Sequence, residues 1–334
     1  MSTSIPATPL NSWQEELIQA IDNPRELLEV LHLPMTLLPA AEAASNLFGL
    51  KVPRPFVERM RKGDPNDPLL RQVLPLGDEL KESEGYQVDP LQEQNTTADP
   101  GLVHKYKSRV LLIAAPNCAI NCRYCFRRHF PYQDNNPARA EWLQTFATIA
   151  ADDNINEVIL SGGDPLANSD RQLQWMVDQL AQIAHVKRLR IHTRLPIVIP
   201  QRITDATLRW LTSSRLQTIV VLHSNHPAEL DDDVANSVKR LRAAHITVLN
   251  QAVLLKSVND DLTTQVSLSE RLFDIGALPY YLHLPDKVQA TAHFDIQQSE
   301  AIALHQQMQS QLSGFLVPKL VKEEPGQSQK TLIF

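Results

Sequence analysis

A series of short aliphatic and β-branched segments, each followed by a helical pattern, begins at residue 109 and limits the folds open to this chain. Strands are predicted at 109–115, 156–160, 187–193, 217–222, 246–250 and 278–284, and a further strand at 315–321. After a first interval of about 47 residues the strands start roughly every 30 residues, the length of one βα unit. Six such units with right-handed crossovers predict an α/β fold whose parallel sheet forms a full or partial TIM-type (βα)6 barrel.

The rest of the chain differs from this core in composition and in its predicted secondary structure. Prolines are scattered through residues 1–100, and a helix is predicted to open at Ser12, which has the spacing of a capping box with Glu15. We expect an N-terminal helical, loop-rich appendage over 1–100, a core over 101–290 and a C-terminal helix and strand over 291–334. In the core, the helix predicted after the first strand collects on one face Trp142, Leu143, Phe146, Ile149 and Ala150.

Composition limits the location and the partners. The chain has 334 residues, 43% of them hydrophobic, which is enough to fill a sizeable core. It contains no stretch of about 18 apolar residues and no signal-like N-terminus, so we expect a cytoplasmic protein without a membrane span. The net charge of -6 gives no general footprint for nucleic acid, although Arg123, Arg127 and Arg128 leave a local basic patch open.

Polar residues follow the predicted strands at the points where each strand ends. In barrels of this kind the chemistry collects at the C-terminal ends of the strands, which share one mouth. The residues found there, in chain order, are the cysteines Cys118, Cys122 and Cys125, the stretch Ser161, Gly162, Gly163, Asp164 and Pro165, then His192, Arg194, His223, Gln251, Asp286 and Glu323. Seven strand ends are therefore predicted to supply one site.

The three cysteines are the most specific signal in the sequence. Cys118, Cys122 and Cys125 have the spacing CxxxCxxC, and the chain has no fourth cysteine. Three thiolates that hold an iron–sulfur cluster leave one iron free to bind a small molecule, which implies a reaction. A structural zinc closed by His129 is the alternative, although structural zinc ligands more usually come in two pairs.

With an aromatic residue before the last cysteine, this loop resembles that of the radical S-adenosylmethionine (SAM) enzymes. The resemblance implies a 4Fe–4S cluster whose unique iron binds SAM. The stretch "SGGDP" is similar to the glycine-rich loop of that superfamily, so Ser161, Gly162, Gly163 and Asp164 are expected beside SAM. By itself this stretch would read as an ordinary strand-to-helix turn.

From "DPNDPLLRQV" to "QSQK" the chain resembles the lysine 2,3-aminomutase family. The resemblance is carried by "RVLLIAAPNCAINCRYCFRR", "LSGGDPL", "RIHTRLPIVIPQRIT", "LHSNHPAEL", "NQAVLLKSVND" and "PYYLHLPD". It implies pyridoxal 5'-phosphate (PLP) as a second cofactor, held by Lys330 in the C-terminal segment. The stretch "EPGQSQK" departs from the glycine-rich run of the family and keeps only Gly326. Without the resemblance, Lys330 would read as a solvated charge.

The same resemblance assigns roles around PLP and SAM. Arg109 matches the ligand of the PLP phosphate, and Tyr106 matches the aromatic residue that packs against the PLP ring. A strand-end ion pair and ordinary core packing are the respective alternatives. His223 and Gln251 resemble SAM contacts, or are simply hydrogen-bonded residues of the mouth.

For the substrate, Arg127 matches the arginine that binds the lysine carboxylate, a task suited to its planar fork. Asp286 and Glu323 match the acids that recognise the distant ammonium, with Glu323 standing where larger enzymes carry aspartate and Glu324 next to it. Buried acids select lysine because an uncharged side chain would leave them unpaired.

The resemblance implies an isomerase that converts L-α-lysine to β-lysine by 2,3-amino migration. It implies a reductant protein such as flavodoxin or ferredoxin. The compact bacterial branch makes β-lysine for elongation factor P, to which a lysyl-tRNA-synthetase-like ligase attaches it. Two alternatives stay open: a radical SAM enzyme without PLP that acts on RNA or peptide, and an iron–sulfur sensor or zinc-stabilised binding module.

Overall fold

The computed structural model describes residues 12–93, 97–132 and 137–334. Its ten strands form one sheet in which the order in space follows the order in the chain. The strands are β1 (Thr97–Asp99), β2 (Leu102–Tyr106), β3 (Arg109–Ala115), β4 (Glu157–Gly162), β5 (Arg188–Thr193), β6 (Gln217–His223), β7 (Thr247–Val253), β8 (Leu278–His283), β9 (Lys319–Lys322) and β10 (Thr331–Leu332). The order runs from β1 at one edge to β10 at the other, so the sheet is open and the predicted partial barrel is confirmed.

Pairing within the sheet is parallel from β3 to β9 and antiparallel at both edges. The six predicted core strands are confirmed, with ends that differ by about three residues or fewer. The seventh was predicted too early, because 314–316 form a short 3-10 helix and Pro318 cannot donate to a sheet ladder. The antiparallel strands β1, β2 and β10 were not predicted.

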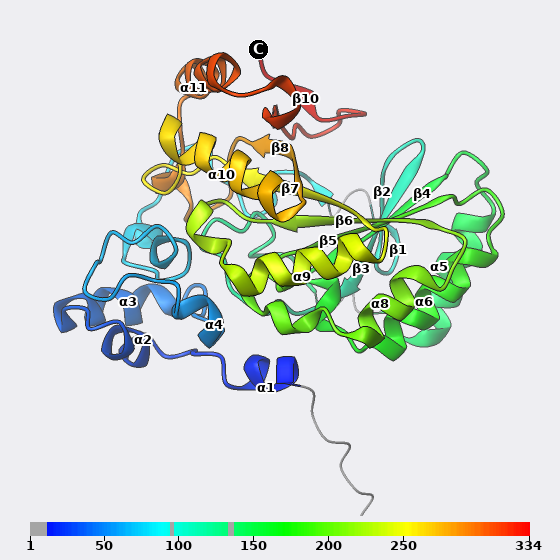
Figure 1. Cartoon of the computed structure of the whole chain (residues 1–334), viewed down its shortest axis with the longest axis horizontal. Helices are drawn as coiled ribbons and strands as arrows, with labels where there is room; N and C mark the ends of the chain where they lie inside the picture. Colours follow the sequence, from blue (N-terminus) through cyan, green and yellow to red (C-terminus); the bar gives the residue numbers. More distant parts are fainter. Residues whose placement is uncertain (1–11, 94–96, 133–136) are drawn as a thin grey trace, which may run out of the picture.

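Six helices connect successive parallel strands, as the βα spacing requires. They are α5 (Arg139–Ala150), α6 (Asp170–Gln182), α8 (Asp205–Thr212), α9 (Asp232–Ala243), α10 (Leu262–Ile275) and α11 (Gln298–Gln311), and a short α7 (Leu195–Val198) precedes α8. Figure 1 shows α5, α6, α8 and α9 along one side of the sheet and the C-terminal segment on the other side. In α5, Trp142, Phe146 and Ile149 are buried as predicted. Leu143 is 50% exposed and Ala150 is exposed, so the predicted face was too wide.

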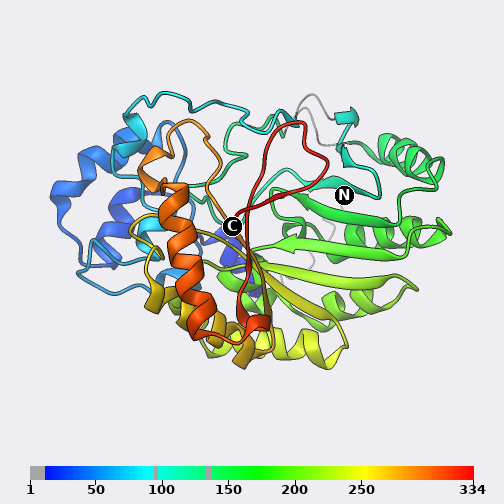
Figure 2. The same cartoon turned by 90° about the horizontal axis from the view of Figure 1, so that it is seen from above.

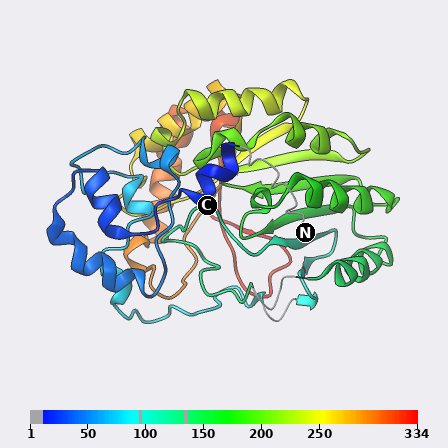
Figure 3. The ribbon, with the colours of Figure 1, turned by 90° about the horizontal axis from the view of Figure 1, so that it is seen from below.

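The N-terminal segment is helical and loop-rich, and it lies beside the sheet (Figures 1 and 3). Its helices are α1 (Ser12–Ile18), α2 (Pro24–Val30), α3 (Leu38–Ser45) and α4 (Arg54–Val57). Most of its buried apolar side chains, among them Trp13 and Phe56, belong to the same hydrophobic cluster as the core of the sheet. Arg59 donates hydrogen bonds to the carbonyls of Ile197 and Glu229. This packing places residues of the N-terminal segment next to the strand ends.

Short 3-10 helices complete the secondary structure of the described residues. They are η1 (Met35–Leu37), η2 (Leu70–Gln72), η3 (Asp78–Leu80), η5 (Pro165–Ala167), η6 (Pro200–Arg202), η7 (Pro227–Glu229), η8 (Ala292–Phe294) and η9 (Gly314–Leu316). In the described part of the chain, each helix is too short or too polar to cross a lipid bilayer.

Candidate active site

The C-terminal ends of seven parallel strands lie along one edge of the sheet, because β3 to β9 all run in the same direction. Neighbouring strands are in register there: His223 of β6 pairs with Gln251 of β7, and Gln251 pairs with Tyr281 of β8. The C-terminal segment after β9 crosses over the strands in Figure 2. The predicted convergence of strand ends on one region is therefore confirmed.

The cysteine loop follows β3 directly. Cys118, Cys122 and Cys125 are free thiols, and the N–H of Cys125 donates to the carbonyl of Cys122 across a tight turn. The ammonium group of Lys51, in the N-terminal segment, donates a hydrogen bond to the carbonyl of Cys118 at 3.0 Å. Burial and the neighbouring Cys122 raise the pKa of Cys125 to about 11. The thiolate form of Cys125 therefore requires a nearby positive charge, which a bound iron would supply.

The glycine-rich loop after β4 lies against the backbone that leads into the cysteine loop. The N–H groups of Gly163 and Asp164 donate to the carbonyls of Ala115 and Asn117, both at 2.8 Å. A Cβ added at Gly163 would lie 2.4 Å from the carbonyl oxygen of Asn117. Gly162 has φ +115°, and a Cβ there would lie 2.7 Å from the carbonyl oxygen of Ala115. Both glycines are thus needed for the close approach of the two loops.

Replacing Gly163 by alanine is expected to lower the free energy of unfolding by about 1 to 3 kcal/mol, because the backbone of Asn117 must move to accept the methyl group. Urea unfolding measures the change. The matched control is Gly49→Ala, since Gly49 has an ordinary φ and no atom within 4 Å of an added Cβ. Equal stability of the two variants would contradict the close packing of the loops.

The carboxylate of Asp164 accepts its hydrogen bonds from neighbouring protein groups. Its Oδ1 accepts from Leu166 N–H and from Thr193 Oγ1, and its Oδ2 accepts from the N–H groups of Arg194 and Leu195. Burial raises the pKa of this carboxyl group. Asp164 therefore ties the end of β4 to the end of β5, and any contact with SAM would have to share these hydrogen bonds.

Arg127 is buried and already paired. Its Nε and Nη2 donate to the two carboxylate oxygens of Glu93, both at 2.7 Å, and its Nη1 donates to Ser161 Oγ at 3.2 Å. The partnership with Glu93 was not predicted. These contacts use three of the five N–H donors of a guanidinium group, so two remain for a second carboxylate.

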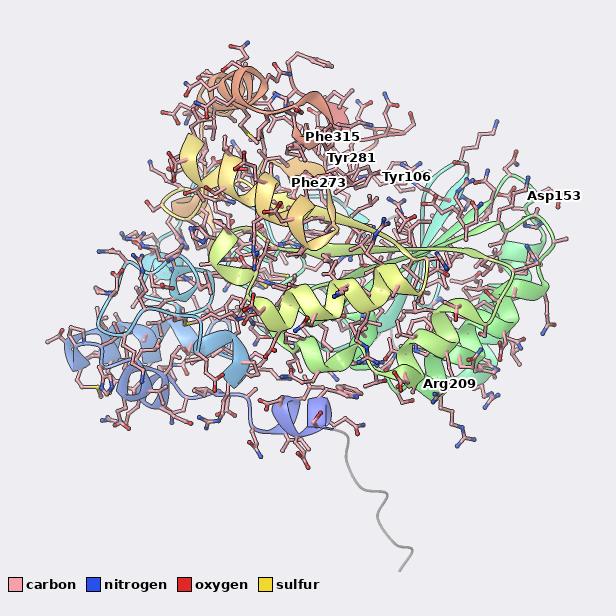
Figure 4. The ribbon with its side chains drawn as sticks, in the orientation of Figure 1. Tyr106, Asp153, Arg209, Phe273, Tyr281 and Phe315 are labelled. Carbon is pink, nitrogen blue, oxygen red and sulfur yellow. The ribbon has the colours of Figure 1, made fainter. Side chains whose placement is uncertain are left out.

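The C-terminal segment brings a group of charges together around Glu323. The carboxylate of Glu323 pairs with the ammonium of Lys330, accepts from Lys105 Nζ at 3.1 Å and accepts from Tyr106 Oη at 3.1 Å. The guanidinium carbon of Arg109 lies 4.0 Å from the centre of the Tyr106 ring. Lys330 Nζ lies 5.6 Å from the centre of the Tyr281 ring. Tyr106 and Tyr281 are labelled in Figure 4.

The carboxyl groups of Glu323 and Asp286 have pKa values shifted in opposite directions. Burial alone would raise the pKa of Glu323, but Lys330 and Lys105 lower it to about 2. Burial and the charge of Glu323 raise the pKa of Asp286 to about 7, against smaller opposing effects of Lys330 and Lys105. Glu93 also raises it. Near neutral pH, Glu323 is ionised, whereas Asp286 is only partly ionised until a further cation arrives.

Replacing Asp286 by asparagine is expected to remove a pH-dependent loss of stability in the cofactor-free protein. Below its ordinary pKa of 3.8 the carboxyl group is neutral in both states, and between about pH 4 and pH 7 only the unfolded state releases the proton. Wild-type stability therefore falls across that window, relative to the variant, and the difference levels off above pH 7. Urea unfolding midpoints at pH 5 and pH 8 measure it, and a constant difference would contradict the raised pKa.

Three partly buried histidines, His192, His223 and His283, lie at the ends of β5, β6 and β8. His223 Nε2 is 3.1 Å from Tyr124 Oη, and the two rings stack with centroids 5.7 Å apart. Burial and Arg194 lower the pKa of His223 to about 3, so it is neutral. Burial also lowers the pKa values of His192 and His283. His192 Nε2 is buried and has no hydrogen-bond partner among the described residues. A bound ligand could supply that hydrogen bond.

Two of the arginines in the predicted basic patch have structural contacts instead. Arg123 is 4% exposed, and it pairs with Glu79 and donates to the carbonyl of Arg71. Arg128 lies over the ring of Phe48 and donates to two carbonyls. With Arg127 paired to Glu93, these side chains do not form the exposed basic surface that RNA binding requires.

Residues 112–264 match the family model described as the Radical SAM superfamily. The chain is 49% identical to the L-lysine 2,3-aminomutase of Haemophilus influenzae over 96% of this chain and 95% of that protein. It is 47% identical to that of Escherichia coli over 96% and 93%. This chain belongs to the lysine 2,3-aminomutase family. Identity to the Clostridium subterminale enzyme of the same name is 31%, over 96% of this chain and 77% of that protein.

Membership of the lysine 2,3-aminomutase family makes the chain a radical SAM enzyme and an isomerase, as the motifs predicted. The alternative of a sensor or binding module is wrong. Enzymes of this family use a 4Fe–4S cluster, SAM and PLP. The donor set fits: three thiols follow β3, the Lys330 ammonium lies near the Tyr281 ring, and Lys330 and Lys105 both pair with Glu323.

Within the described ranges, no three His, Cys, Asp or Glu side chains are arranged as the ligands of one metal ion. The cysteines of a cubane cluster bind different irons, so a cluster does not require them to meet at one point.

Proposed function

We propose that this protein converts L-α-lysine to β-lysine by 2,3-amino migration, with SAM and PLP as cofactors. The observation that carries the proposal is the shared edge of the sheet. It joins the cysteine loop after β3 to the Lys330 and Glu323 group after β9. Arg127, two positions after Cys125, and Asp286, after β8, supply groups of the charge that the two ends of lysine require.

Residues for the cofactors follow from the donor set. Cys118, Cys122 and Cys125 would hold the cluster, and Lys330 would hold PLP with Tyr106 and Arg109 nearby. When bound, the cofactors supply a hydrogen-abstracting radical and a conjugated ring that spreads the unpaired electron during migration. The SAM contacts expected of His223, Gln251 and the Ser161 to Asp164 stretch stay predictions, with Gly162 and Gly163 also required for packing.

The chain's own groups orient the substrate. Arg127 binds the lysine carboxylate with its two remaining N–H donors, while Glu93 and Ser161 hold the guanidinium in place. Asp286 receives the distant ammonium, and that cation completes the ionisation of a carboxyl group that is half neutral near pH 7. Glu323 adds a permanently ionised acid. An amino acid with an uncharged side chain would leave Asp286 without this cationic partner.

The test uses anaerobically purified protein. Iron, sulfide and PLP are measured, and the protein is incubated with SAM, a reductant and L-lysine before the products are resolved on a chiral column. β-Lysine formation that requires all three additions is the expected result. A loaded enzyme that cleaves SAM and yields no β-lysine would contradict the proposal, and loading without PLP would restore the alternative of a radical SAM enzyme acting on RNA or peptide.

We further propose that the β-lysine serves the modification of elongation factor P. In this proposal a lysyl-tRNA-synthetase-like ligase is the next enzyme, flavodoxin or ferredoxin is the reductant, and the location is cytoplasmic. Support comes from the resemblance to the compact bacterial branch and from nearly full-length similarity to the bacterial relatives. Mass spectrometry of elongation factor P from cells without this gene tests it: an unchanged mass would contradict the role.

A further inference from the structure

Arg194 is a buried arginine at the end of β5 that has contacts with the cysteine loop. Its backbone N–H donates to Asp164 Oδ2 at 2.7 Å, and the side chain is almost fully enclosed, since the residue is 6% exposed. The Nη1 atom donates to Cys122 Sγ at 2.7 Å and to Tyr124 Oη at 2.5 Å. Within the described residues, Cys122 is the one cysteine whose sulfur accepts a side-chain hydrogen bond.

The other edge of the guanidinium is fixed by a buried acid. Arg194 Nη2 donates to Glu229 Oε2 at 3.2 Å and to Gln72 Oε1 at 2.7 Å. Glu229 is itself fully buried, and its Oε1 accepts from the N–H groups of Asn225 and His226. Both terminal nitrogens of the Arg194 guanidinium are therefore held by hydrogen bonds, which keep the positive charge next to Cys122 Sγ.

We infer that Arg194 is a positioning residue for the iron–sulfur cluster, which orients the Cys122 thiolate and raises the reduction potential of the cluster. The inference rests on the proposed binding of the cluster by Cys118, Cys122 and Cys125. Reduction adds one negative charge, so a fixed cation at one ligand stabilises the reduced form. Hydrogen bonds to the sulfurs and net charge are the main means by which proteins set cluster potentials.

Two substitutions should move the potential in opposite directions. Arg194→Gln removes the cation and lowers the midpoint potential, so that the cluster is harder to reduce. Glu229→Gln removes the anion that balances the arginine and raises the potential. A tenfold change in the one-electron equilibrium corresponds to about 59 mV. Arg194→Lys keeps the charge and is expected to lie between the wild type and Arg194→Gln.

The matched control is Arg202→Gln. Arg202 is another buried arginine of the same region. It pairs with Asp170 and donates to the carbonyl of Leu166, and its ion-pair and hydrogen-bond partners among the described residues include no residue of the cysteine loop. The holoenzyme of each variant is reconstituted, its iron content is measured, and the midpoint potential is determined by anaerobic titration followed by electron paramagnetic resonance.

Opposite shifts in Arg194→Gln and Glu229→Gln, with the control unchanged, support the inference. Unchanged potentials in iron-loaded variants overturn it while leaving the proposed function in place. If Arg194→Gln does not fold, the direction of the shift in Glu229→Gln decides, and a shift to lower potential overturns the inference. Wild-type protein that binds no cluster would overturn the proposed function and this inference together.

Discussion

Replacement of Lys330 by arginine is expected to abolish β-lysine formation, with a loss of at least about 10⁴-fold, the order seen when a residue that acts covalently is removed. Arginine keeps the positive charge beside Glu323, so the ion pair and the fold remain. A guanidinium cannot act as the amine that PLP requires, because it does not lose its proton in proteins. The measurements are product formation and borohydride labelling of residue 330, identified by peptide mass.

The control for Lys330→Arg is Lys322→Arg. Lys322 ends β9 and also pairs with a carboxylate, at 2.8 Å from Glu324. This variant is expected to keep both activity and the pyridoxyl label. A label that stays at another lysine in Lys330→Arg, with activity retained, would show that Lys330 does not hold PLP.

Replacement of Cys125 by alanine is expected to reduce iron content and SAM cleavage to background. Cys125 is partly buried, and desolvation raises the pKa of its thiol to about 11, so the sulfur is suited to a metal and poorly suited to a free thiolate. PLP labelling of Lys330 should persist, because Lys330 belongs to the C-terminal segment and contacts Glu323 and Tyr281, not the cysteine loop. Iron analysis, visible absorbance and methionine release measure these effects.

Asn121→Ala serves as the control for the cysteine loop. Asn121 lies between Cys118 and Cys122 and donates its side-chain amide to the carbonyl of Gly49, without a thiol. It is expected to keep most of the iron. Full iron loading of Cys125→Ala would contradict the assignment of the cluster, and loss of iron in Asn121→Ala alone would indicate that loop anchoring limits loading.

The parallel part of the fold could be predicted because each βα unit repeats the same pattern. The edge strands could not, since β10 has two residues and β1 has three, too few for an alternating pattern. The exposure of Leu143 was missed for a different reason: the predicted apolar face of α5 was wider than the part that contacts the sheet. Helical periodicity gives the direction of a face and not its width.

The edge on which the site residues lie could also be predicted, whereas their partners could not. Arg194 and Cys122 are 72 positions apart in the chain, and Arg127 and Glu93 are 34 apart. No local pattern links residues at such separations, and a charged residue in a single sequence normally indicates solvent exposure. Lys105 was overlooked beside Tyr106 because its role depends on Glu323, which arrives from the far end of the chain.

The two residues of β10 have a consequence for the chain terminus. The loop from Glu323 to Lys330 is closed by pairing of Thr331 with Lys322 and of Leu332 with Val321, and by a hydrogen bond from Ile333 N–H to the carbonyl of Leu320. Phe334, which follows the paired strand β10, is 90% exposed. A chain cut directly after Lys330 would keep every residue proposed to bind cofactor or substrate. It would lose the backbone pairing that holds Lys330 in place, so Thr331, Leu332 and Ile333 are needed to position the lysine although none of them binds cofactor or substrate.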